Sequence, residues 1–556
     1  MSANERVEQP RAPRRVLVVG GVAGGASAAA RLRRLDEACE IVVFDKGPYV
    51  SFANCGLPYY VGNVIQEEKK LLVATSDLFK QRFRIEVRTE HEVLAIDREA
   101  KTIRVRDLRA GTLRDERYDA LVLSPGAFAI KPSVPGVDLP GIFSVRTIPD
   151  SRRVRDWITG KSAKTALVVG GGFIGLEMAD NLALRGLAVT IVEKAAQLLP
   201  PLDPEMAVPL QQRLEERGVT VRLGDGVTSF SAEEGGRLVA STEQGAQLAA
   251  DLIILAIGVR PETALARDAG LELGPSGGIK VDAAMRTSDP SIWAVGDAVE
   301  SQDFVTGGRQ VVPLAGPANR MGRTAADAIA GREARFRGVQ GTAVCGAFGL
   351  TVAMTGASEK SLRRNGMTDY EVVYLHPGHH VGYFPGARPI HLKLVYRRGD
   401  GRVLGAQAVG EEGVEKRIDV IAMALQLKGT VHDLEEAELC YAPQFGAAKD
   451  PVNLAGFIAG NSRSGDMPTA PWSEAQGGVL LDVREPAEVA KDPIPGAVHI
   501  PLHQLRGRLG ELPKDRVIRV TCAVGQRAYY AVRTLRQSGF DARQLPGGFQ
   551  TWATLR

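Results

Sequence analysis

Two cysteines lie in stretches whose residue types could do sulfur chemistry, and the first is Cys55. It stands in Ser51-Phe-Ala-Asn-Cys55-Gly-Leu-Pro-Tyr-Tyr60, with a serine rather than a second cysteine four residues earlier. A lone thiol cannot store two electrons in an internal disulfide. Cys55 is therefore predicted to cycle through a mixed disulfide with a small thiol or through a sulfenic acid.

The second is Cys522, in Cys522-Ala-Val-Gly-Gln-Arg527. The apolar run 517–522 predicts a strand and residues 528–537 predict a helix, so this cysteine is expected in a turn at a helix N-terminus. The backbone N–H groups of such a turn, together with Arg527, stabilise a thiolate or a persulfide. The other cysteines are Cys39, Cys345 and Cys440, and no two of the five form a Cys-x-x-Cys pair, so neither a zinc cluster nor a disulfide framework is indicated.

A dinucleotide-binding unit precedes Cys55. An apolar strand at 16–20 leads into a glycine turn and a helix at 26–35, and the next strand, 41–44, ends at Asp45. The turn brings backbone N–H groups to a pyrophosphate, and the acid accepts a ribose hydroxyl. Val22 occupies the position of the usual second glycine. The glycines are Gly20, Gly21, Gly24 and Gly25.

The same layout returns at 165–193 with a complete fingerprint, Gly170-Gly171-Gly172-Phe-Ile-Gly175, and a strand that ends at Glu193. Two units predict two dinucleotides, a bound flavin and a diffusing nicotinamide. Glu193 is expected to accept the ribose 2′-hydroxyl of NADH and to repel the phosphate of NADPH, although Lys194 beside it leaves NADPH open.

These motifs, with strands at 118–127, 251–262 and 287–297, resemble in their order the pyridine nucleotide-disulfide oxidoreductase family. The stretches 51–60, 312–320, 382–387 and 439–443 resemble its single-cysteine branch of the coenzyme A-disulfide reductase type, over roughly residues 14 to 461. The resemblance implies that the first unit and Asp297 hold FAD, and that an NAD(P)H domain is nested inside the FAD domain. The cofactor residues it implies are Gly20, Gly21, Ala23, Gly24, Gly25, Asp45, Lys46, Asn54, Gly126, Gly296 and Asp297 for FAD, and Gly170, Gly172, Gly175, Glu193 and Gly258 for the nicotinamide.

The same resemblance implies a coenzyme A site and a homodimer. Tyr383 and Tyr441 are expected to reach the active site of the other subunit beside its Cys55, and Arg31 and Arg34 are expected to pair with the coenzyme A phosphates. The coenzyme A residues it implies are Ser27, Arg31, Arg34, Ser51, Asn54, Asn319 and Lys449. The segment after residue 473 resembles a rhodanese domain, with Cys522 and Arg527 in its active loop and supporting motifs at 482–484 and 495–499.

The predicted fold class is α/β, with two Rossmann-like domains for FAD and NAD, an α+β dimerisation domain and an α/β rhodanese domain. The expected boundaries are 1–13 for a disordered N-terminus, 14–148 and 280–334 for the FAD domain, 149–279 for the NAD(P)H domain, 335–460 for dimerisation, 461–473 for a linker and 474–556 for rhodanese. A length of 556 residues accommodates this division.

Composition excludes several function classes. A net charge of +4 over this length does not indicate a nucleic-acid partner. No apolar run reaches about eighteen residues, so no membrane span is predicted, and the N-terminus lacks the apolar core of a signal peptide, which favours a cytoplasmic protein. His376, His379 and His380 have no carboxylate or cysteine nearby in sequence and are expected in a surface loop, so no metal is predicted.

The leading hypothesis is an FAD-dependent NAD(P)H reductase of persulfides, polysulfides and coenzyme A disulfide. Electrons would pass from the nicotinamide through the flavin to Cys55, which rests as a mixed disulfide with coenzyme A, while Cys522 handles sulfane sulfur. One alternative is an NADH oxidase or peroxidase in which Cys55 cycles as a sulfenic acid. Another is a sulfur-carrier or redox-sensing partner protein.

Overall fold

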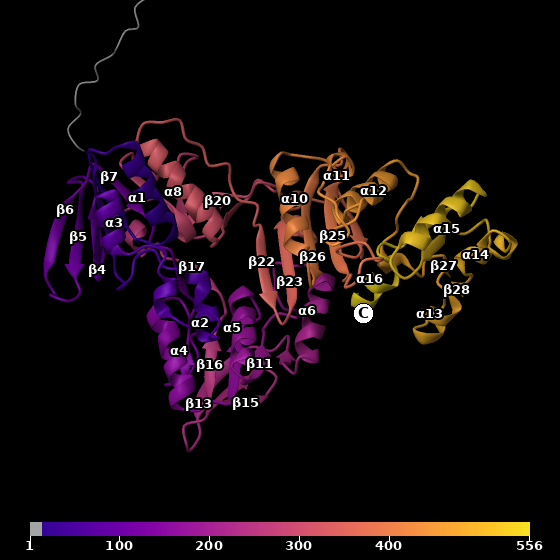
Figure 1. Ribbon diagram of the computed structural model, residues 1–556, viewed down its shortest axis with the longest axis horizontal. Coiled ribbons are helices and arrows are strands. Elements are labelled where there is room, and N and C mark those ends of the chain that lie inside the picture. Colours follow the sequence, from indigo (N-terminus) through magenta and orange to yellow (C-terminus); the bar gives the residue numbers. More distant parts are fainter. Residues whose placement is uncertain (1–13, 556) are drawn as a thin grey trace, which may run out of the picture. The chain divides into compact units, whose positions relative to one another are not determined.

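The computed structural model describes residues 14–555; the predicted disordered N-terminus, 1–13, and residue 556 lie outside the described residues. The chain divides into two compact units (Figure 1). Of the described residues, the first unit contains 14–194 and Asp225–Val339, and the second contains Ala195–Gly224 and 340–555. Among the described residues, every helix is too short or too polar to span a bilayer.

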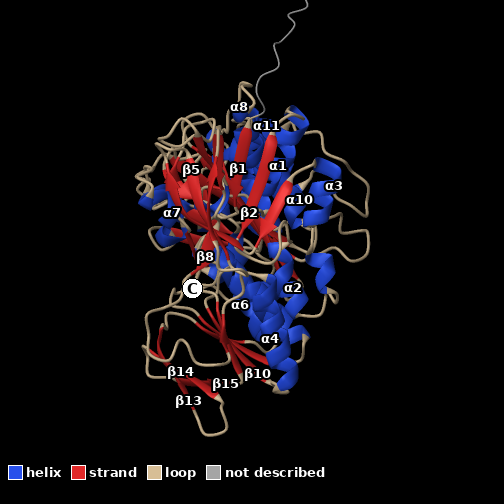
Figure 2. Ribbon diagram, turned by 90° about the vertical axis from the view of Figure 1, so that its left-hand side faces the viewer, coloured by secondary structure: helices blue, strands red, loops and turns tan. Residues whose placement is uncertain are grey.

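The first unit is built on a parallel sheet in the order β19-β7-β1-β2-β3. Its central strands, β1 (Arg15–Val19), β2 (Glu40–Asp45) and β7 (Ala120–Leu123), are buried on both faces, which explains their unbroken apolar runs. The outer strands are β3 (Glu86–Thr89) and β19 (Ile292–Ala294). Helices α1 (Ala23–Leu35) and α8 (Ala315–Ile329) pack on each other, and Figure 2 shows α1 beside β1.

A second parallel sheet in this unit contains β11 (Ala188–Val192), β10 (Thr165–Val169), β16 (Leu252–Leu255) and β9 (Ile142–Phe143), in that order. Helices α4 (Ile148–Gly160) and α5 (Phe173–Leu184) accompany it. This nested nucleotide domain agrees with the predicted fold class. Its sheet begins before the predicted boundary at 149, because β9 pairs with β16 at its edge.

Smaller elements complete the first unit. Its antiparallel sheets are β4-β5-β6 (His91–Asp97, Thr102–Asp107, Leu113–Arg117), β13-β14-β15 (Val227–Ala232, Leu238–Thr242, Gln247–Ala250) and β8-β17 (Ala127–Ala129, Val259–Pro261), and a mixed sheet is β18-β20-β21 (Ile279–Lys280, Val299–Gln302, Arg309–Val311). Its remaining helices are η1 (Asn54–Gly56), α2 (Leu57–Val61), η2 (Glu68–Leu71), α3 (Ser76–Phe83), α7 (Ala264–Asp268) and η3 (Gly296–Ala298).

The second unit contains an antiparallel sheet in the order β22-β23-β26-β25-β24 (Ala343–Ala347, Leu350–Gly356, Val403–Gly410, Ile390–Arg397, Tyr370–Leu375). Strand β26 is buried along its whole length and forms the core. With this sheet belong the helices α6 (Pro204–Glu216), α9 (Glu359–Arg364), α10 (Val414–Gln426), α11 (Val431–Glu435) and α12 (Pro451–Arg463). The short strand β12 (Thr220–Arg222) follows α6 in the chain.

The C-terminal part has a parallel sheet in the order β28-β27-β29-β30 (Val498–His499, Val479–Asp482, Ile518–Thr521, Ala542–Gln544). The segment predicted as a linker, 461–473, is structured: α12 runs on to Arg463, and Thr469 forms a bridge with Gln544 of β30. The remaining elements are η4 (Trp472–Glu474), α13 (Pro486–Lys491), α14 (Leu502–Leu505), η5 (Leu509–Glu511), α15 (Gln526–Gln537) and α16 (Gly548–Thr554).

Candidate active site

The segment that carries Cys55 is anchored to the first glycine turn. Ser51 has a left-handed backbone (φ 48°), and its N–H donates to the Gly21 carbonyl oxygen at 2.9 Å. Two further N–H groups, of Val73 and Ala74, donate to the Ser51 carbonyl oxygen. Cys55 then lies in the short helix η1 with its residue exposed, so the lone thiol is presented at the surface of this chain.

Arg146 is a site residue that the sequence prediction missed. The Asn54 amide donates to the Arg146 carbonyl oxygen at 3.0 Å, and the Arg146 guanidinium donates back to the Asn54 side-chain oxygen. The guanidinium also donates to the Ala127 carbonyl oxygen at 2.9 Å and lies 3.5 Å from an Asp297 carboxylate oxygen. Arg146 therefore joins the residue before Cys55 to the predicted flavin acid, more than 150 positions later in the chain. No local motif signals this role.

Charges around Cys55 control its ionisation. Partial burial raises the pKa of the Cys55 thiol, and the carboxylates of Glu177 and Asp297 raise it further, while Arg146 opposes them. Burial likewise raises the pKa of Glu177, whose carboxylate accepts a hydrogen bond from Tyr59 at 3.4 Å. The surrounding protein therefore disfavours a free Cys55 thiolate, which fits a thiol that is stored as a disulfide.

The first turn fits the pyrophosphate of a dinucleotide. Gly20 has a φ of +92°, and a Cβ on Gly25 would lie 1.9 Å from the Gly20 carbonyl oxygen, so only glycine lets α1 approach β1 this closely. Asp45 accepts hydrogen bonds from the N–H groups of Gly21 and Gly47 at 2.9 and 2.8 Å. Burial raises the pKa of Asp45.

The other predicted FAD residues gather at the same sheet edge. Gly126 and Gly296 both have positive φ angles, +76° and +82°. Gly24 admits no side chain, because a Cβ there would lie 2.9 Å from Val295. Asp297 lies in η3 directly after β19, and burial raises its pKa. Ala23 begins α1, and the Lys46 residue is exposed at the end of β2.

The second turn fits a nicotinamide dinucleotide. Gly170 has a φ of +110°, and a Cβ on Gly175 would lie 2.0 Å from its carbonyl oxygen. A Cβ on Gly172 would meet no atom within 4 Å, so the space in front of the N-terminus of α5 is open for a ligand. Glu193 accepts the Gly171 N–H at 2.6 Å. The Lys194 ammonium pairs with Glu243 at 2.8 Å, so its positive charge is partly compensated. Gly258, with a φ of +108°, follows β16.

The residues assigned to coenzyme A are only partly brought together. The Ser27 hydroxyl on α1 hydrogen-bonds the Asn319 side chain on α8. Arg31 on α1 is already engaged, because its guanidinium makes hydrogen bonds of 2.9 and 2.7 Å to one oxygen of Asp327. Arg34 and Lys449 are exposed. Ser51 and Asn54 precede Cys55 in the same segment.

The two tyrosines assigned to the active site meet within the second unit. The hydroxyls of Tyr383 and Tyr441, 58 residues apart, lie 2.7 Å from each other, and this hydrogen bond raises the pKa of Tyr383. Tyr383 is 75% exposed and Tyr441 46% exposed, so neither is a core residue in this chain. Tyr441 and Cys440 also line a pocket of about 390 Å³.

The Cys522 turn has the predicted local geometry. The N–H of Gly525, which directly precedes α15 and has a φ of +100°, donates to the Cys522 sulfur at 3.1 Å. Cys522 itself is 0% exposed, within the core of the C-terminal part. Arg527 forms two hydrogen bonds, of 2.6 and 2.7 Å, with the Glu488 carboxylate. Its positive charge is therefore shared with an acid that the sequence prediction did not assign.

The histidines differ from their expected place in a surface loop. His379 and His380 are buried, at 5% and 6% exposure, and His376 contacts His391 with a distance of 2.8 Å between their Nδ1 atoms. Burial and the neighbouring His391 lower the pKa of His376 to about 3. The expectation of a surface loop was wrong because tertiary packing encloses the segment.

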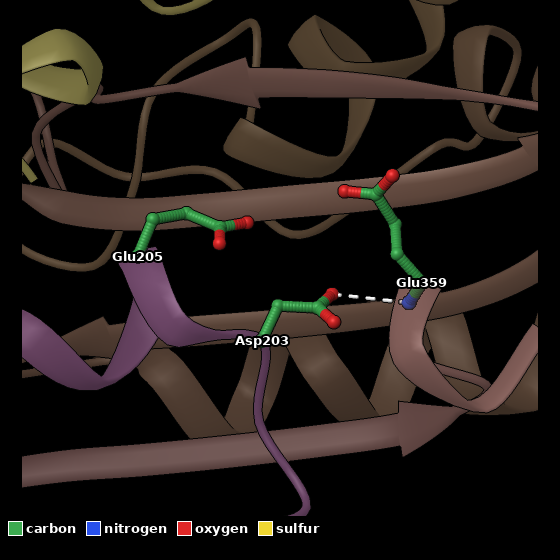
Figure 3. A group of neighbouring side chains, drawn as sticks. All are labelled: Asp203, Glu205 and Glu359. Carbon is green, nitrogen blue, oxygen red and sulfur yellow. Dashed lines mark hydrogen bonds between the residues drawn. The ribbon is translucent and has the colours of Figure 1, made fainter. Parts of the chain in front are cut away.

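Among the described residues, one group could offer a metal three close ligand atoms: Asp203, Glu205 and Glu359, seen in Figure 3 near the starts of α6 and α9. The ammonium group of Lys393 occupies this position. Its distances to oxygens of the three carboxylates are 2.7, 2.5 and 2.6 Å. The cluster is thus a buried ion network in the second unit.

The fold and these sites identify the class of protein. Residues 14–322 match the pyridine nucleotide-disulphide oxidoreductase family, residues 342–450 match its dimerisation domain, and residues 471–555 match the rhodanese-like domain. The chain belongs to the pyridine nucleotide-disulphide oxidoreductase family and carries a rhodanese-like domain at its C-terminal end. It is therefore an oxidoreductase of a family that uses FAD and NAD(P)H.

Individual relatives indicate which members of this family the chain resembles in sequence and structure. A coenzyme A disulfide reductase of Staphylococcus epidermidis is 36% identical over 446 residues, which cover 80% of this chain and 99% of the relative. The crystal structure of reduced Bacillus anthracis CoADR-RHD is similar with a TM-score of 0.96 and 46% identity, covering 98% of this chain and 99% of the other. An NAD-dependent persulfide reductase from A. fulgidus has a TM-score of 0.90 and 37% identity over 97% of this chain and all of the other.

A more distant neighbour bears on the alternative activity. A water-forming NADH oxidase from Lactobacillus brevis has a TM-score of 0.77 and 26% identity, and it covers 81% of this chain and 99% of its own.

Proposed function

We propose that the protein is an NAD(P)H-dependent reductase of persulfides, polysulfides and coenzyme A disulfide that acts through Cys55. The observation that carries the proposal is the lone exposed thiol in η1, with Ser51 four residues before it. The coenzyme A disulfide reductase and persulfide reductase relatives support it. A cytoplasmic location, with no nucleic acid or membrane as partner, is part of the proposal.

The two glycine turns would hold the cofactors. The first turn, with Asp45 and Asp297, would hold FAD, and the second, with Glu193, would hold the nicotinamide. Bound FAD and NAD(P)H supply the two electrons for the reduction. NADH is favoured because Glu193 faces the turn and accepts the Gly171 N–H, so an added 2′-phosphate would meet a carboxylate.

Cys55 performs the sulfur chemistry. Its thiolate attacks the sulfur of the persulfide that is bonded to carbon, the S–S bond breaks, and hydrosulfide leaves. The mixed disulfide on Cys55 then takes two electrons and one proton, which restores the Cys55 thiolate and releases the thiol. One persulfide and one NAD(P)H thus give one thiol, one hydrosulfide and NAD(P)⁺. With coenzyme A disulfide the first leaving group is coenzyme A thiolate.

Arg146 holds the residue before Cys55 and partly offsets the carboxylates of Glu177 and Asp297. Through these contacts it limits how far the pKa of the thiol rises. Coenzyme A would lie along α1 and α8, where Ser27 and Asn319 meet, and the exposed Arg34 on α1 would approach its phosphates. Lys449, exposed in the second unit, stays a predicted coenzyme A residue. Arg31 would first have to share its bond to Asp327.

The protein acts as a homodimer in this proposal. The match to the dimerisation domain and the exposed Tyr383–Tyr441 pair support it. Two hydroxyls joined by one hydrogen bond can donate a further bond to a thiolate leaving group. They would serve Cys55 of the partner subunit.

Cys522 would carry sulfane sulfur in this proposal. The Gly525 N–H at 3.1 Å favours an anionic sulfur there, and Arg527, though paired with Glu488, adds positive charge beside the turn. Cys522 would take the outer sulfur of a donor as its own persulfide and present it for reduction.

An NADH oxidase or peroxidase is the second candidate, supported by the Lactobacillus brevis neighbour. In that case Cys55 would cycle as a sulfenic acid and the rhodanese-like domain would have no part in the reaction. A sulfur-carrier or redox-sensing protein is the third, and steady NADH turnover with small sulfur substrates would exclude it.

Mass spectrometry of the purified full-length protein distinguishes the proposed reductase from the NADH oxidase or peroxidase. An adduct with the mass of coenzyme A on Cys55 is expected, and its removal by a reductant should restore one free thiol. Cys55→Ser should abolish NADH-dependent hydrosulfide release from coenzyme A persulfide, whereas Cys345→Ser, a buried cysteine in β22, should not. Full hydrosulfide release by Cys55→Ser would contradict the proposal.

A further inference from the structure

The turn that holds Cys522 depends on a side chain from another strand. Gln544 lies in β30, is 5% exposed, and donates from its amide nitrogen to the Gly525 carbonyl oxygen at 3.0 Å. The N–H of the same Gly525 donates to the Cys522 sulfur at 3.1 Å. One glycine residue is therefore held by Gln544 at its carbonyl and presents its amide proton to the sulfur.

The fit between the two residues is close. Gly525 has a φ of +100°, a conformation that favours glycine, and a Cβ added there would lie 2.8 Å from the Gln544 amide nitrogen. The Gln544 amide oxygen is buried without a hydrogen-bond partner among the described residues. Turning the amide over would place this oxygen against the Gly525 carbonyl, so the contact fixes which way the amide points.

The backbone of Gln544 is held as well. Its N–H donates to the Pro468 carbonyl oxygen at 2.8 Å, and its carbonyl accepts the Ala470 N–H at 2.9 Å. On the other side β30 pairs with β29, in the register Gln544 to Val520, two residues before Cys522. The segment that follows α12 is thus bridged to β30 at Thr469 and fixes the residue that supports the sulfur turn.

We propose that Gln544 is a positioning residue for the chemistry of Cys522: by holding the Gly525 carbonyl it aims the Gly525 N–H at the sulfur and so stabilises the anionic, nucleophilic form. This inference rests on the proposed role of Cys522 only for its consequence in sulfur transfer. The contact and its effect on the thiol can be measured without that role.

The test compares the alkylation of Cys522 by iodoacetamide at pH 7.5 in the full-length, FAD-loaded protein, followed on the Cys522 peptide by mass spectrometry. Gln544→Met keeps the length of the side chain but cannot donate, and Gln544→Asn keeps an amide that is too short to reach Gly525. Both are expected to lower the alkylation rate of Cys522 by about fivefold, because the Gly525 N–H is no longer aimed at the sulfur.

A purely structural role would move the rate in the opposite direction. Cys522 is 0% exposed, so loosening the domain should expose it and speed its alkylation. Phe540→Leu, a core change between the end of α15 and β30, provides that control and is expected to raise the rate. An unchanged or faster rate in both folded Gln544 variants would overturn the proposal, and Gln544→Asn decides if Gln544→Met does not fold.

Loading with inorganic polysulfide separates this inference from the proposed function. Wild-type protein should gain one sulfur atom on Cys522, and both Gln544 variants should gain it about fivefold more slowly. If wild-type Cys522 takes up no sulfur, the proposed sulfur-carrying role fails, while the alkylation rates still decide the role of Gln544.

Discussion

The two cysteines to which the proposal assigns sulfur chemistry lie in opposite surroundings. Cys55 is exposed in a short helix, and burial together with Glu177 and Asp297 raises its pKa. Cys522 is enclosed, with a backbone N–H directed at its sulfur. An open thiol among carboxylates suits a large substrate and storage as a disulfide, whereas an enclosed sulfur beside an N–H suits a small sulfane atom. The surroundings of each cysteine, and not the residue type alone, therefore determine which sulfur chemistry it can perform.

The largest expected effect comes from removing the enclosed thiol. Cys522→Ala should reduce sulfur transfer from polysulfide more than 100-fold, because it removes the sulfur to which the Gly525 N–H donates. Reduction of coenzyme A disulfide should stay within about twofold of wild type, since the proposal assigns this reaction to Cys55. The two assays are sulfur uptake by mass spectrometry and NADH oxidation. Cys345→Ala is the control. An equal loss in both assays for Cys522→Ala would mean that both reactions depend on the same site, which contradicts the proposal.

Arg146→Gln tests how the charges around Cys55 set the pKa of its thiol. Loss of the guanidinium removes its bond to Asn54 and the charge that lowers the pKa of Cys55, so the pKa should rise further. The alkylation rate of Cys55 at pH 8 is expected to fall about threefold. Arg153→Gln, an exposed pair with Asp150 on α4, should leave the rate unchanged. A rate equal to wild type would remove Arg146 from the site.

The pH profile of Cys55 alkylation should respond to Glu177 in the opposite sense. Because the Glu177 carboxylate raises the pKa of Cys55, Glu177→Gln should move the profile toward lower pH. At a fixed pH below the pKa of Cys55, a lower pKa raises the fraction of thiolate. The alkylation rate at pH 8 should therefore increase about threefold. Glu99→Gln changes an exposed carboxylate between β4 and β5 and is expected to have no effect. A profile that moves to higher pH would contradict this assignment.

The smallest effect concerns how Cys522 is enclosed. The N–H groups of Phe549 and Gln550 in α16 donate to the carbonyl oxygens of Cys522 and Ala523, and Thr551 hydrogen-bonds His376 at 2.9 Å. Thr551→Val should weaken this attachment by about 1 kcal/mol and raise the alkylation rate of Cys522 about twofold.

Thr534→Val is the matched control for that change, because the Thr534 hydroxyl bonds only within α15, to the Tyr530 carbonyl. It should leave the Cys522 rate unchanged. If both variants raise the rate equally, α16 does not control access to the thiol.

The sequence by itself determined the elements whose geometry is local. Gly20, Gly25 and Gly170 had to be glycine because a turn, a positive φ or a close approach of helix to strand requires it, and the structure contains all three features. The absence of a second cysteine four residues from Cys55 is likewise visible in the chain. So is the turn from Cys522 to α15, because the hydrogen bond from Gly525 spans three residues.

Only the tertiary structure decided which distant side chains meet these elements. Arg146 reaches Asn54 and Asp297, Arg31 pairs with Asp327, Arg527 pairs with Glu488, and Gln544 supports Gly525. Each partner lies between 19 and 296 residues away in the chain, so packing and not spacing brings it into place. The same reason explains the buried histidines and the structured segment 461–473. Backbone turns follow from a few neighbouring residues, whereas charge pairing around a thiol depends on how whole sheets and helices pack.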